Sequence, residues 1–120
     1  MPSAIFDSRQ TAYRSPFGAV EEKTPVLFRI RMPRWLQCRA AFLLRQADGG
    51  LPEMDGMFWA GMDGEDHEWW DCRYAPPEAG LYWYGFAVDT CQGRRYILRQ
   101  PDGTGLLSQQ DGQRWQLTCY

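Results

Sequence analysis

The sequence predicts an all-β fold, an antiparallel β-sandwich or barrel of about seven to eight short strands. Several segments alternate apolar and polar residues with a period of two, and turn residues recur about every dozen residues. No segment requires a helix of ordinary length. The 120 residues suit one domain, 1–120, and a hydrophobic content of 44% is sufficient for a core.

The longest aromatic and β-branched run, residues 80–90, is predicted to be the central strand. Its residues alternate between two faces, as expected for a strand with one face in a core. Three large aromatic side chains on one face would bury enough area to anchor a small domain. The face predicted to be buried carries Tyr82, Tyr84, Phe86 and Val88, and the opposite face carries Trp83, Gly85 and Ala87.

The other strands are expected in chain order, with a turn before each. Residues 26–32 alternate clearly, and Val26, Phe28, Ile30 and Met32 are predicted to face inward. Further strands are expected at residues 57–62, 68–74, 94–99 and 115–120, and residues 5–8 are expected to form a short strand or a strap across a sheet edge.

Residues 38–45 require a further argument, because Ala, Leu and Arg also favour a short helix. The length of this segment and the neighbouring β patterns favour a strand. Residues 94–99 follow the turn at 91–93 closely, so they are predicted to form a hairpin with the central strand.

Charge and composition exclude several classes of partner. The net charge is −2 and the basic residues are scattered, so neither nucleic acid nor an anionic membrane is an expected partner. No apolar run approaches the roughly 20 residues of a membrane span. The N-terminus has no basic region followed by an apolar one, so we expect no signal peptide and a cytoplasmic protein.

The residues that carry catalysis or bind metals are scarce. Four cysteines include no CxxC pair and the single histidine is His67, so no metal or other cofactor is expected. Disulfides are possible with an even number of cysteines, but buried thiols are the preferred interpretation. The acidic stretch 63–68 lacks the spacing of an EF-hand. No nucleophile, phosphate-binding or zinc-protease motif is present, so no catalytic residue is predicted.

Aromatic residues are the strongest functional indication. Six tryptophans are too many for the interior of so small a domain, and the adjacent Trp69 and Trp70 must point to opposite faces of a strand. An exposed aromatic ring suits stacking on a sugar, whereas stacking on nucleic acid would also require a basic groove. Such rings could equally cover an adjoining domain or a subunit. The candidate carbohydrate-binding residues, chosen for their expected exposure, are Trp59, Trp69, Trp83 and Tyr82.

Five segments, in order, resemble the N-terminal domain of α-amylase-family enzymes (glycoside hydrolase family 13) of the neopullulanase and cyclomaltodextrinase type. The resemblance covers nearly the whole chain. The segments are IFDSR at 5–9, YRSPFGAV at 13–20, VLFRIRMPR at 26–34, GLYWYGF at 80–86 and WQLTCY at 115–120.

The resemblance implies an immunoglobulin-like sandwich that precedes a (β/α)₈ catalytic barrel. The catalytic carboxylates of such enzymes lie on the barrel, and none of their motifs occurs here. The chain is therefore expected to be an excised domain or fragment of a longer α-glucan hydrolase, without activity of its own. Related domains bind α-glucan or pack against the barrel or a second subunit, so these are the expected partners, with a homodimer possible. The alternative is a stand-alone carbohydrate-binding module that uses exposed Trp and Tyr.

Overall fold

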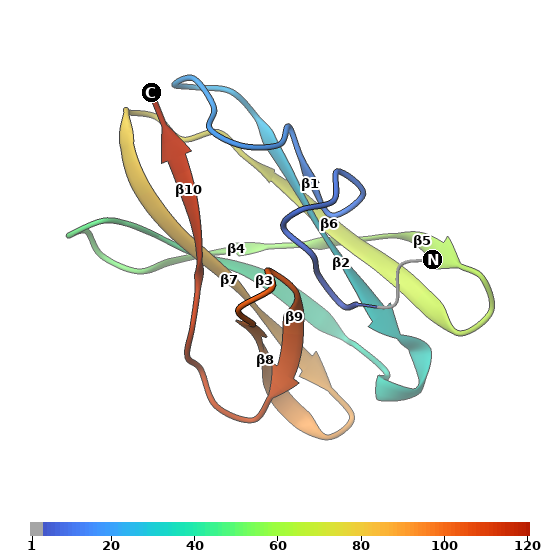
Figure 1. Ribbon diagram of the computed structural model, residues 1–120. Helices are drawn as coiled ribbons and strands as arrows, with labels where there is room; N and C mark the ends of the chain where they lie inside the picture. The colour runs from blue at the N-terminus through green and yellow to red at the C-terminus, as the bar shows by residue number, and fades with distance from the viewer. Residues whose placement is uncertain (1–3) are drawn as a thin grey trace.

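Two antiparallel β-sheets pack face to face in the computed structural model, which describes residues 4–120 (Figure 1). The prediction of an all-β sandwich is confirmed, and apart from the 3-10 turn η1 these residues contain no helix. The elements are β1 (Arg14–Ser15), β2 (Val26–Pro33), η1 (Arg34–Leu36), β3 (Ala40–Ala47), β4 (Glu53–Gly56), β5 (Phe58–Asp63), β6 (His67–Tyr74), β7 (Gly80–Thr90), β8 (Gly93–Arg99), β9 (Gly105–Ser108) and β10 (Trp115–Cys119).

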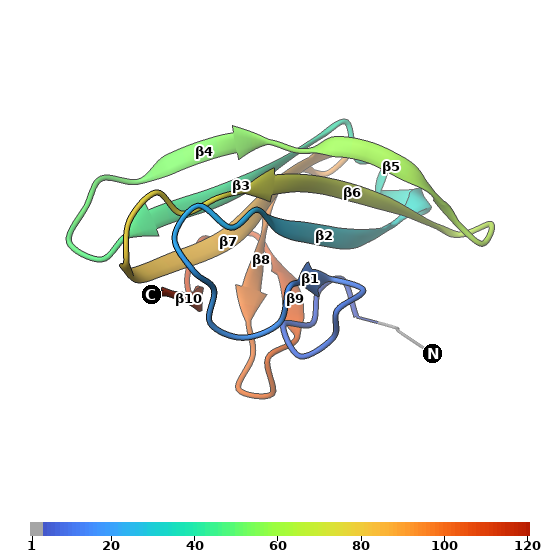
Figure 2. The ribbon, with the colours of Figure 1, turned by 90° about the horizontal axis from the view of Figure 1, so that it is seen from above.

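The strand order is that of an immunoglobulin-like sandwich. The first sheet has the order β1-β2-β6-β5, which corresponds to strands A, B, E and D of that fold. The second sheet has the order β4-β3-β7-β8-β9, and β10 also pairs with β7. Strands β3, β7 and β8 therefore take the positions of C, F and G. In Figure 2 the strands of the two sheets overlap, and the hairpin of β8 and β9 projects from them.

The core forms where the predicted apolar faces of β2 and β7 meet. Every second residue of β2 from Val26 to Met32 is at most 1% exposed, as the alternation predicts. On β7, Tyr84 and Phe86 are 2% and 0% exposed. The ring of Tyr84 lies 4.7 Å from that of Phe28, so the aromatic residues of the two sheets pack directly on each other.

The central strand β7 has two partners along the same edge. Strand β8 pairs with residues 86–90, and β10 pairs with residues 80–84. Between them the chain leaves β7 and forms β9, which pairs with β8 at the edge of the second sheet. A single G strand is thus divided by an excursion over residues 99–114, and this excursion forms a wall beside the outer face of the second sheet.

The N-terminal residues form the predicted strap rather than a regular strand. Asp7 makes an isolated bridge with Thr104, and the amide of Gly105 donates to the carbonyl oxygen of Phe6 at 2.8 Å. Phe6 is fully buried among aromatic residues of both sheets. The amide of Arg31 on β2 donates to the carbonyl oxygen of Ile5 at 2.8 Å. The strap therefore covers the first sheet and links it to β9.

Three short strands, β1, β4 and β9, were not predicted, so the sandwich has more strands than the seven to eight expected. They contain two to four residues each, too few for periodicity to identify. Strand β4 is also rich in acidic residues, and the guanidinium of Arg45 on β3 holds it by ion pairs to Glu53 and Asp55. The prediction that Cys38 begins β3 is wrong, because Gln37 adopts a left-handed backbone conformation and β3 begins at Ala40.

None of the helices in residues 4–120 has the length and apolar character that crossing a bilayer demands.

Candidate functional site

Tyr82, one of the four candidate sugar-binding residues, belongs to the core instead. Its side chain is 7% exposed, so its expected exposure is wrong. Its hydroxyl donates to the carbonyl oxygen of Glu78 at 2.7 Å. A tyrosine at the start of strand F that bonds back to the preceding corner is the tyrosine corner of immunoglobulin-like folds. The role of Tyr82 here is therefore structural.

Trp69 points to the outer face of the first sheet but is covered by its own chain. The ring of Tyr13, from the segment that precedes β1, lies 5.4 Å from Trp69 edge to face. The guanidinium of Arg29 lies 4.2 Å from the centre of the indole ring. With one neighbour above and one beside it, Trp69 is only partly exposed, and no large area of its ring is available to a ligand.

Trp70 faces the opposite side of β6, as expected for adjacent residues of a strand, and lies at the open edge of the sandwich. Its indole N–H donates to the carboxylate of Glu68 at 2.7 Å. Glu68 is 6% exposed, and the guanidinium of Arg34 lies 3.4 Å from its other oxygen. A hollow of about 360 Å³ opens here between Trp70 and Trp59, its register partner on β5.

Strand β5 carries three exposed large apolar side chains, and we call this strand edge the Trp59 edge: Phe58 (72% exposed), Trp59 (53%) and Met62 (44%). Trp59 and Met62 lie on the same face as their register partners on β6, Trp70 and Glu68, whereas Phe58 pairs with Asp71 and lies on the other face. Residues 56–62 contain no charged side chain. Two other places at the sheet edges have cover, because Val20 pairs with Cys119 of β10 and Asp7 pairs with Thr104, directly before β9. Within residues 4–120, no segment pairs with the outer side of β5. An uncovered apolar edge strand is unusual and indicates a contact surface.

Trp83 has a different setting, on the outer face of the second sheet. Its register partners on β3 and β10 are Gln46 and Gln116, both exposed. Directly paired residues of neighbouring strands lie on the same face of a sheet, so the indole is flanked by an amide on each side. The indole N–H donates to Asp48 at 3.3 Å, which fixes the direction of the ring.

Two hollows adjoin Trp83, and together we call them the Trp83 groove. The first has a volume of about 290 Å³ and the second about 460 Å³. The first is lined by Leu44, Arg45, Gln46, Pro52, Glu53, Met54, Ala87, Arg94, Tyr96, Asp111 and Arg114, and the second by Ser8, Arg99, Pro101, Gly103, Gln113, Trp115 and Gln116, with Trp83 in both.

The floor of the first hollow exists because β7 carries small residues beside Trp83. Gly85 and Ala87 follow it on the same face. The side chain of Arg114 lies directly on Gly85, where an added Cβ would come within 2.7 Å of its guanidinium. Asp111 accepts a hydrogen bond from Arg114 at 2.5 Å and holds it in place. A larger residue at position 85 would displace Arg114 into the hollow.

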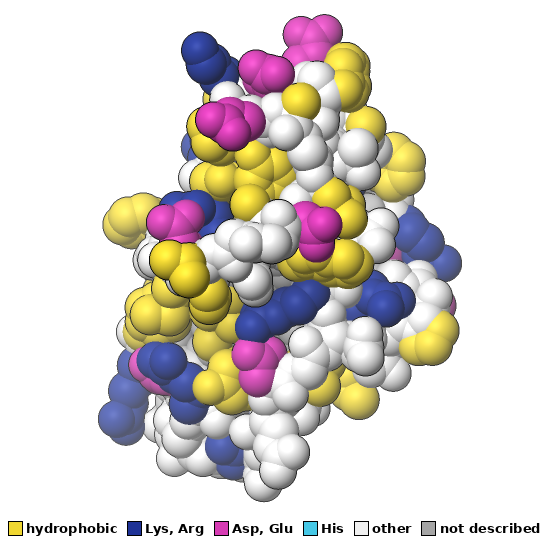
Figure 3. All heavy atoms as spheres, turned by 90° about the vertical axis from the view of Figure 1, so that its left-hand side faces the viewer, with side chains coloured by type: hydrophobic (Ala, Val, Ile, Leu, Met, Phe, Trp, Pro, Cys, Tyr) yellow, Lys and Arg dark blue, Asp and Glu magenta, His cyan; other side chains and the backbone are white. Residues whose placement is uncertain are grey.

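The groove is charged, and most of its charged side chains are paired with a group of opposite sign. Each arginine around the first hollow is paired with a carboxylate, and the Arg94 guanidinium, by hydrogen bonding, lowers the pKa of Asp89. Arg99 in the second hollow donates to the carbonyl oxygen of Arg114 at 2.8 Å. On the side of the molecule that Figure 3 shows, hydrophobic, basic and acidic side chains are intermingled, and neither sign of charge forms a large continuous patch. The first hollow, whose arginines are paired, therefore suits a neutral polar ligand, whereas Arg99 gives the second hollow a guanidinium that has no carboxylate partner.

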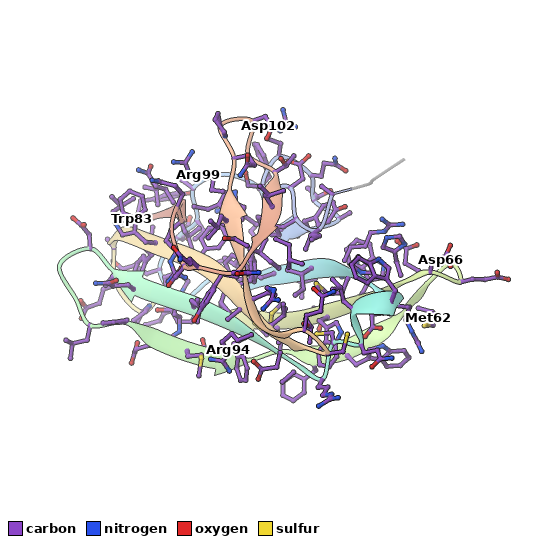
Figure 4. All side chains as sticks on the ribbon, turned by 90° about the horizontal axis from the view of Figure 1, so that it is seen from below. Met62, Asp66, Trp83, Arg94, Arg99 and Asp102 are labelled. Carbon is purple, nitrogen blue, oxygen red and sulfur yellow. The ribbon has the colours of Figure 1, made fainter. Side chains whose placement is uncertain are left out.

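The structure does not bring the four candidate residues together. In Figure 4, Trp83 and Arg99 lie on one side of the molecule, whereas Met62 of the Trp59 edge lies at the opposite end. Trp83 and Trp59 line separate hollows, and no residue is common to the two linings. The candidate tryptophans that line hollows are therefore at two separate places, and of these only the Trp83 groove combines an indole ring with flanking amides.

Groups that could perform chemistry are not assembled at either place. His67 is the first residue of β6 and pairs with Asp63, beside the turn in which it was predicted. Among residues 4–120 no three His, Cys, Asp or Glu side chains gather as metal ligands, and the four cysteines form no disulfide. Burial raises the pKa of the Cys38 and Cys72 thiols to about 12. Cys91 is exposed, so the expectation that all four thiols are buried is wrong.

Comparison with known proteins supports the fold. No protein-family model matches the sequence, and no curated protein matches it. A solved structure described as a cyclomaltodextrinase matches with a TM-score of 0.68 and 18% sequence identity. The match covers 96% of this chain and 19% of that chain, so this chain spans about a fifth of the length of that protein. At this identity the likeness shows the fold alone.

Sequence reasoning found Trp83 but missed its neighbours. Gln46, Gln116 and Arg114 come from three separate segments, and none belongs to a motif. Their positions depend on the register of β3 and β10 against β7, which alternation within one strand cannot give. The available signal was the small residues at 85 and 87, which mark a hollow next to Trp83 on the same face.

Proposed function

We propose that this chain is a non-catalytic accessory domain of a larger α-amylase-family glycoside hydrolase that acts on α-glucans. The observation that carries the proposal is the coverage of the fold match, 96% of this chain against 19% of the cyclomaltodextrinase chain. The five segments that resemble the N-terminal domain of such enzymes support the same assignment. We place no catalytic residue on this chain, because no base, nucleophile or carboxylate pair lies in either hollow with a poised partner.

Two measurements test this assignment. An antibody raised against the chain should detect, in extracts of its source cells, a polypeptide several times larger than 14.0 kDa. A single band at 14.0 kDa would contradict the assignment. The purified chain should also fail to cleave a chromogenic maltoside, and turnover would identify it as an enzyme in its own right.

The Trp59 edge is the surface through which the domain would pack against the catalytic barrel or a second subunit. Large aromatic side chains and Met are enriched at protein interfaces, and this edge presents Phe58, Trp59 and Met62 without a charge between them. Without its partner, the isolated chain should self-associate as its concentration rises in sedimentation velocity. The double variant Phe58→Ser/Trp59→Ser should remain monomeric. A wild-type chain that stays monomeric at millimolar concentration would argue against this role.

A second function, α-glucan binding, is favoured by the row of Gln46, Trp83 and Gln116. An indole ring can stack on the apolar face of a sugar, and an amide on each side can bond to its hydroxyls. Of the candidates Trp59, Trp69, Trp83 and Tyr82, we therefore assign the role to Trp83. Maltoheptaose should quench the tryptophan fluorescence of the wild-type chain and bind Trp83→Ala at least about tenfold more weakly, which equals a loss of about 1.4 kcal/mol. Equal binding by both would remove Trp83 from the site.

A further inference from the structure

We infer that the Trp83 groove binds the interior of an extended oligosaccharide, passing across Trp83 from one hollow into the other, and that it does not recognise a chain end. This inference rests on the α-glucan binding proposed above and adds how the ligand is placed. It assigns one sugar unit to the indole of Trp83 and at least one unit to each hollow, so the shortest ligand that fills the groove has three units.

Trp83 is shared by the two hollows, since its side chain lines both of them. No other residue of the described chain is common to the two linings. The indole therefore borders both hollows, and a ligand that contacts it adjoins space in each of them. A site for a terminal sugar would instead need a wall at one end of the ring.

The rims of both hollows are exposed, so a chain can enter and leave. At the far side of the first hollow, Met54 on β4 and Arg94 on β8 are exposed. At the far side of the second hollow, Pro101 and Gln113 are exposed. Buried groups lie only in the floor, at Ala87 in the first hollow and Trp115 in the second. The groove is thus a trough on the face of the sheet.

The two hollows differ in chemistry, which gives the bound chain unequal contacts. Leu44, Met54 and Tyr96 supply apolar and aromatic surface to the first hollow. Ser8, Gln113 and Gln116 supply uncharged donors and acceptors to the second hollow, and Arg99 adds a guanidinium without a carboxylate partner. A sugar chain carries apolar ring faces and polar edges, so the first hollow suits ring faces and the second suits hydroxyls. Because the arginines of the first hollow are already paired, a charged polymer gains no extra attraction there.

The test is a calorimetric length series with the full chain: maltose, maltotriose, maltotetraose, maltopentaose and maltoheptaose, together with β-cyclodextrin. Affinity should rise steeply up to three or four units and then level off. Borohydride reduction of the terminal sugar of maltoheptaose should leave its affinity within about twofold. β-Cyclodextrin, which has no ends, should still bind.

Variants in each hollow locate the ligand. Met54→Ala in the first hollow and Gln113→Ala in the second should each weaken maltoheptaose binding by about tenfold, or 1.4 kcal/mol, while changing the weak binding of maltose by less than threefold. Both positions are exposed, so folding should survive, and circular dichroism checks this. Trp35→Ala, an exposed tryptophan on η1 outside both linings, is the control and should bind like the wild type.

The possible failures are distinguishable. If no glucan binds at any length, the proposed glucan binding itself fails. If maltoheptaose binds and Trp83→Ala abolishes it, but reduction of the end removes affinity or only one hollow responds to substitution, the site reads a chain end and this inference is overturned. Binding that is already maximal with maltose would overturn it as well.

Discussion

Each sheet of the sandwich carries a partly exposed tryptophan on its outer face, and the two have different surroundings. Trp69 on β6 is covered by Tyr13 and Arg29. Trp83 on β7 borders two hollows and is flanked by glutamines of the neighbouring strands. The strands are alike in their alternation, so strand pattern does not determine which outer face is free. The segments outside the strands determine it.

The segment that covers Trp69 on the first sheet is the N-terminal strap. It runs along β2 and places Tyr13 over Trp69, so the first sheet is buried on both faces at this point. On the second sheet the chain between β8 and β10 takes a different course, because it lies beside the outer face and borders a hollow that Trp83 also lines. The N-terminal strap therefore covers the outer face of the first sheet, and the excursion between β8 and β10 borders a groove on the second.

The largest expected effect comes from removing the anchor of the strap. Phe6 is fully buried and contacts the rings of Tyr13, Phe86 and Trp115. Phe6→Ala should reduce the free energy of unfolding by about 3–5 kcal/mol, the usual range for deleting a buried aromatic side chain. Urea denaturation measures this, and a loss below about 1 kcal/mol would show that the strap does not help to hold the sheets together.

Replacement of Trp69 should cost stability but not ligand affinity. Because its ring packs under Tyr13 and Arg29, Trp69→Ala should lose about 2 kcal/mol, less than a fully buried tryptophan would. Maltoheptaose affinity, measured by calorimetry below the unfolding midpoint, should stay within twofold of the wild type. A strong loss of affinity in a variant that is still folded would place the sugar on the first sheet instead.

A smaller effect is expected at the tyrosine corner. Tyr82→Phe removes the hydrogen bond to the carbonyl oxygen of Glu78 and should reduce stability by about 1 kcal/mol without altering glucan binding. The matched control is Tyr120→Phe, an exposed tyrosine near the end of the described chain, which should change stability by less than about 0.5 kcal/mol. Reduced glucan affinity in Tyr82→Phe would show that this residue contributes to the binding site after all.

The smallest expected effect on stability, and the most specific one on the groove, belongs to Gly85→Ala. The new Cβ would meet the flexible side chain of Arg114, which can move, so stability should change by less than about 1 kcal/mol. The displaced Arg114 would enter the first hollow and weaken maltoheptaose binding severalfold. The double variant Gly85→Ala/Arg114→Ala should recover part of that affinity, and no recovery would exclude obstruction by Arg114.

The sequence predicted the sandwich well because its long strands have one buried face. Residues 80–90 and 26–32 alternate so regularly that their inward faces could be predicted directly, and their bounds to within one residue, because β2 also includes Pro33. Alternation within a strand cannot predict which other segment of the chain will cover its outer face. Trp69 and Trp83 look alike in the sequence, and only the path of the strap distinguishes them. Tyr82 was predicted to lie on the buried face of its strand, and its choice as a sugar ligand gave too little weight to that alternation.

The most direct test of the central claim, that Trp83 and not Trp69 is the recognition residue, is a paired titration with maltoheptaose. Wild-type chain, Trp83→Ala and Trp69→Phe would be compared by calorimetry, with circular dichroism to verify folding. We predict saturable binding for the wild type and Trp69→Phe, and at least about tenfold weaker binding for Trp83→Ala. Equal affinity in all three folded chains, or loss only in Trp69→Phe, would contradict the account.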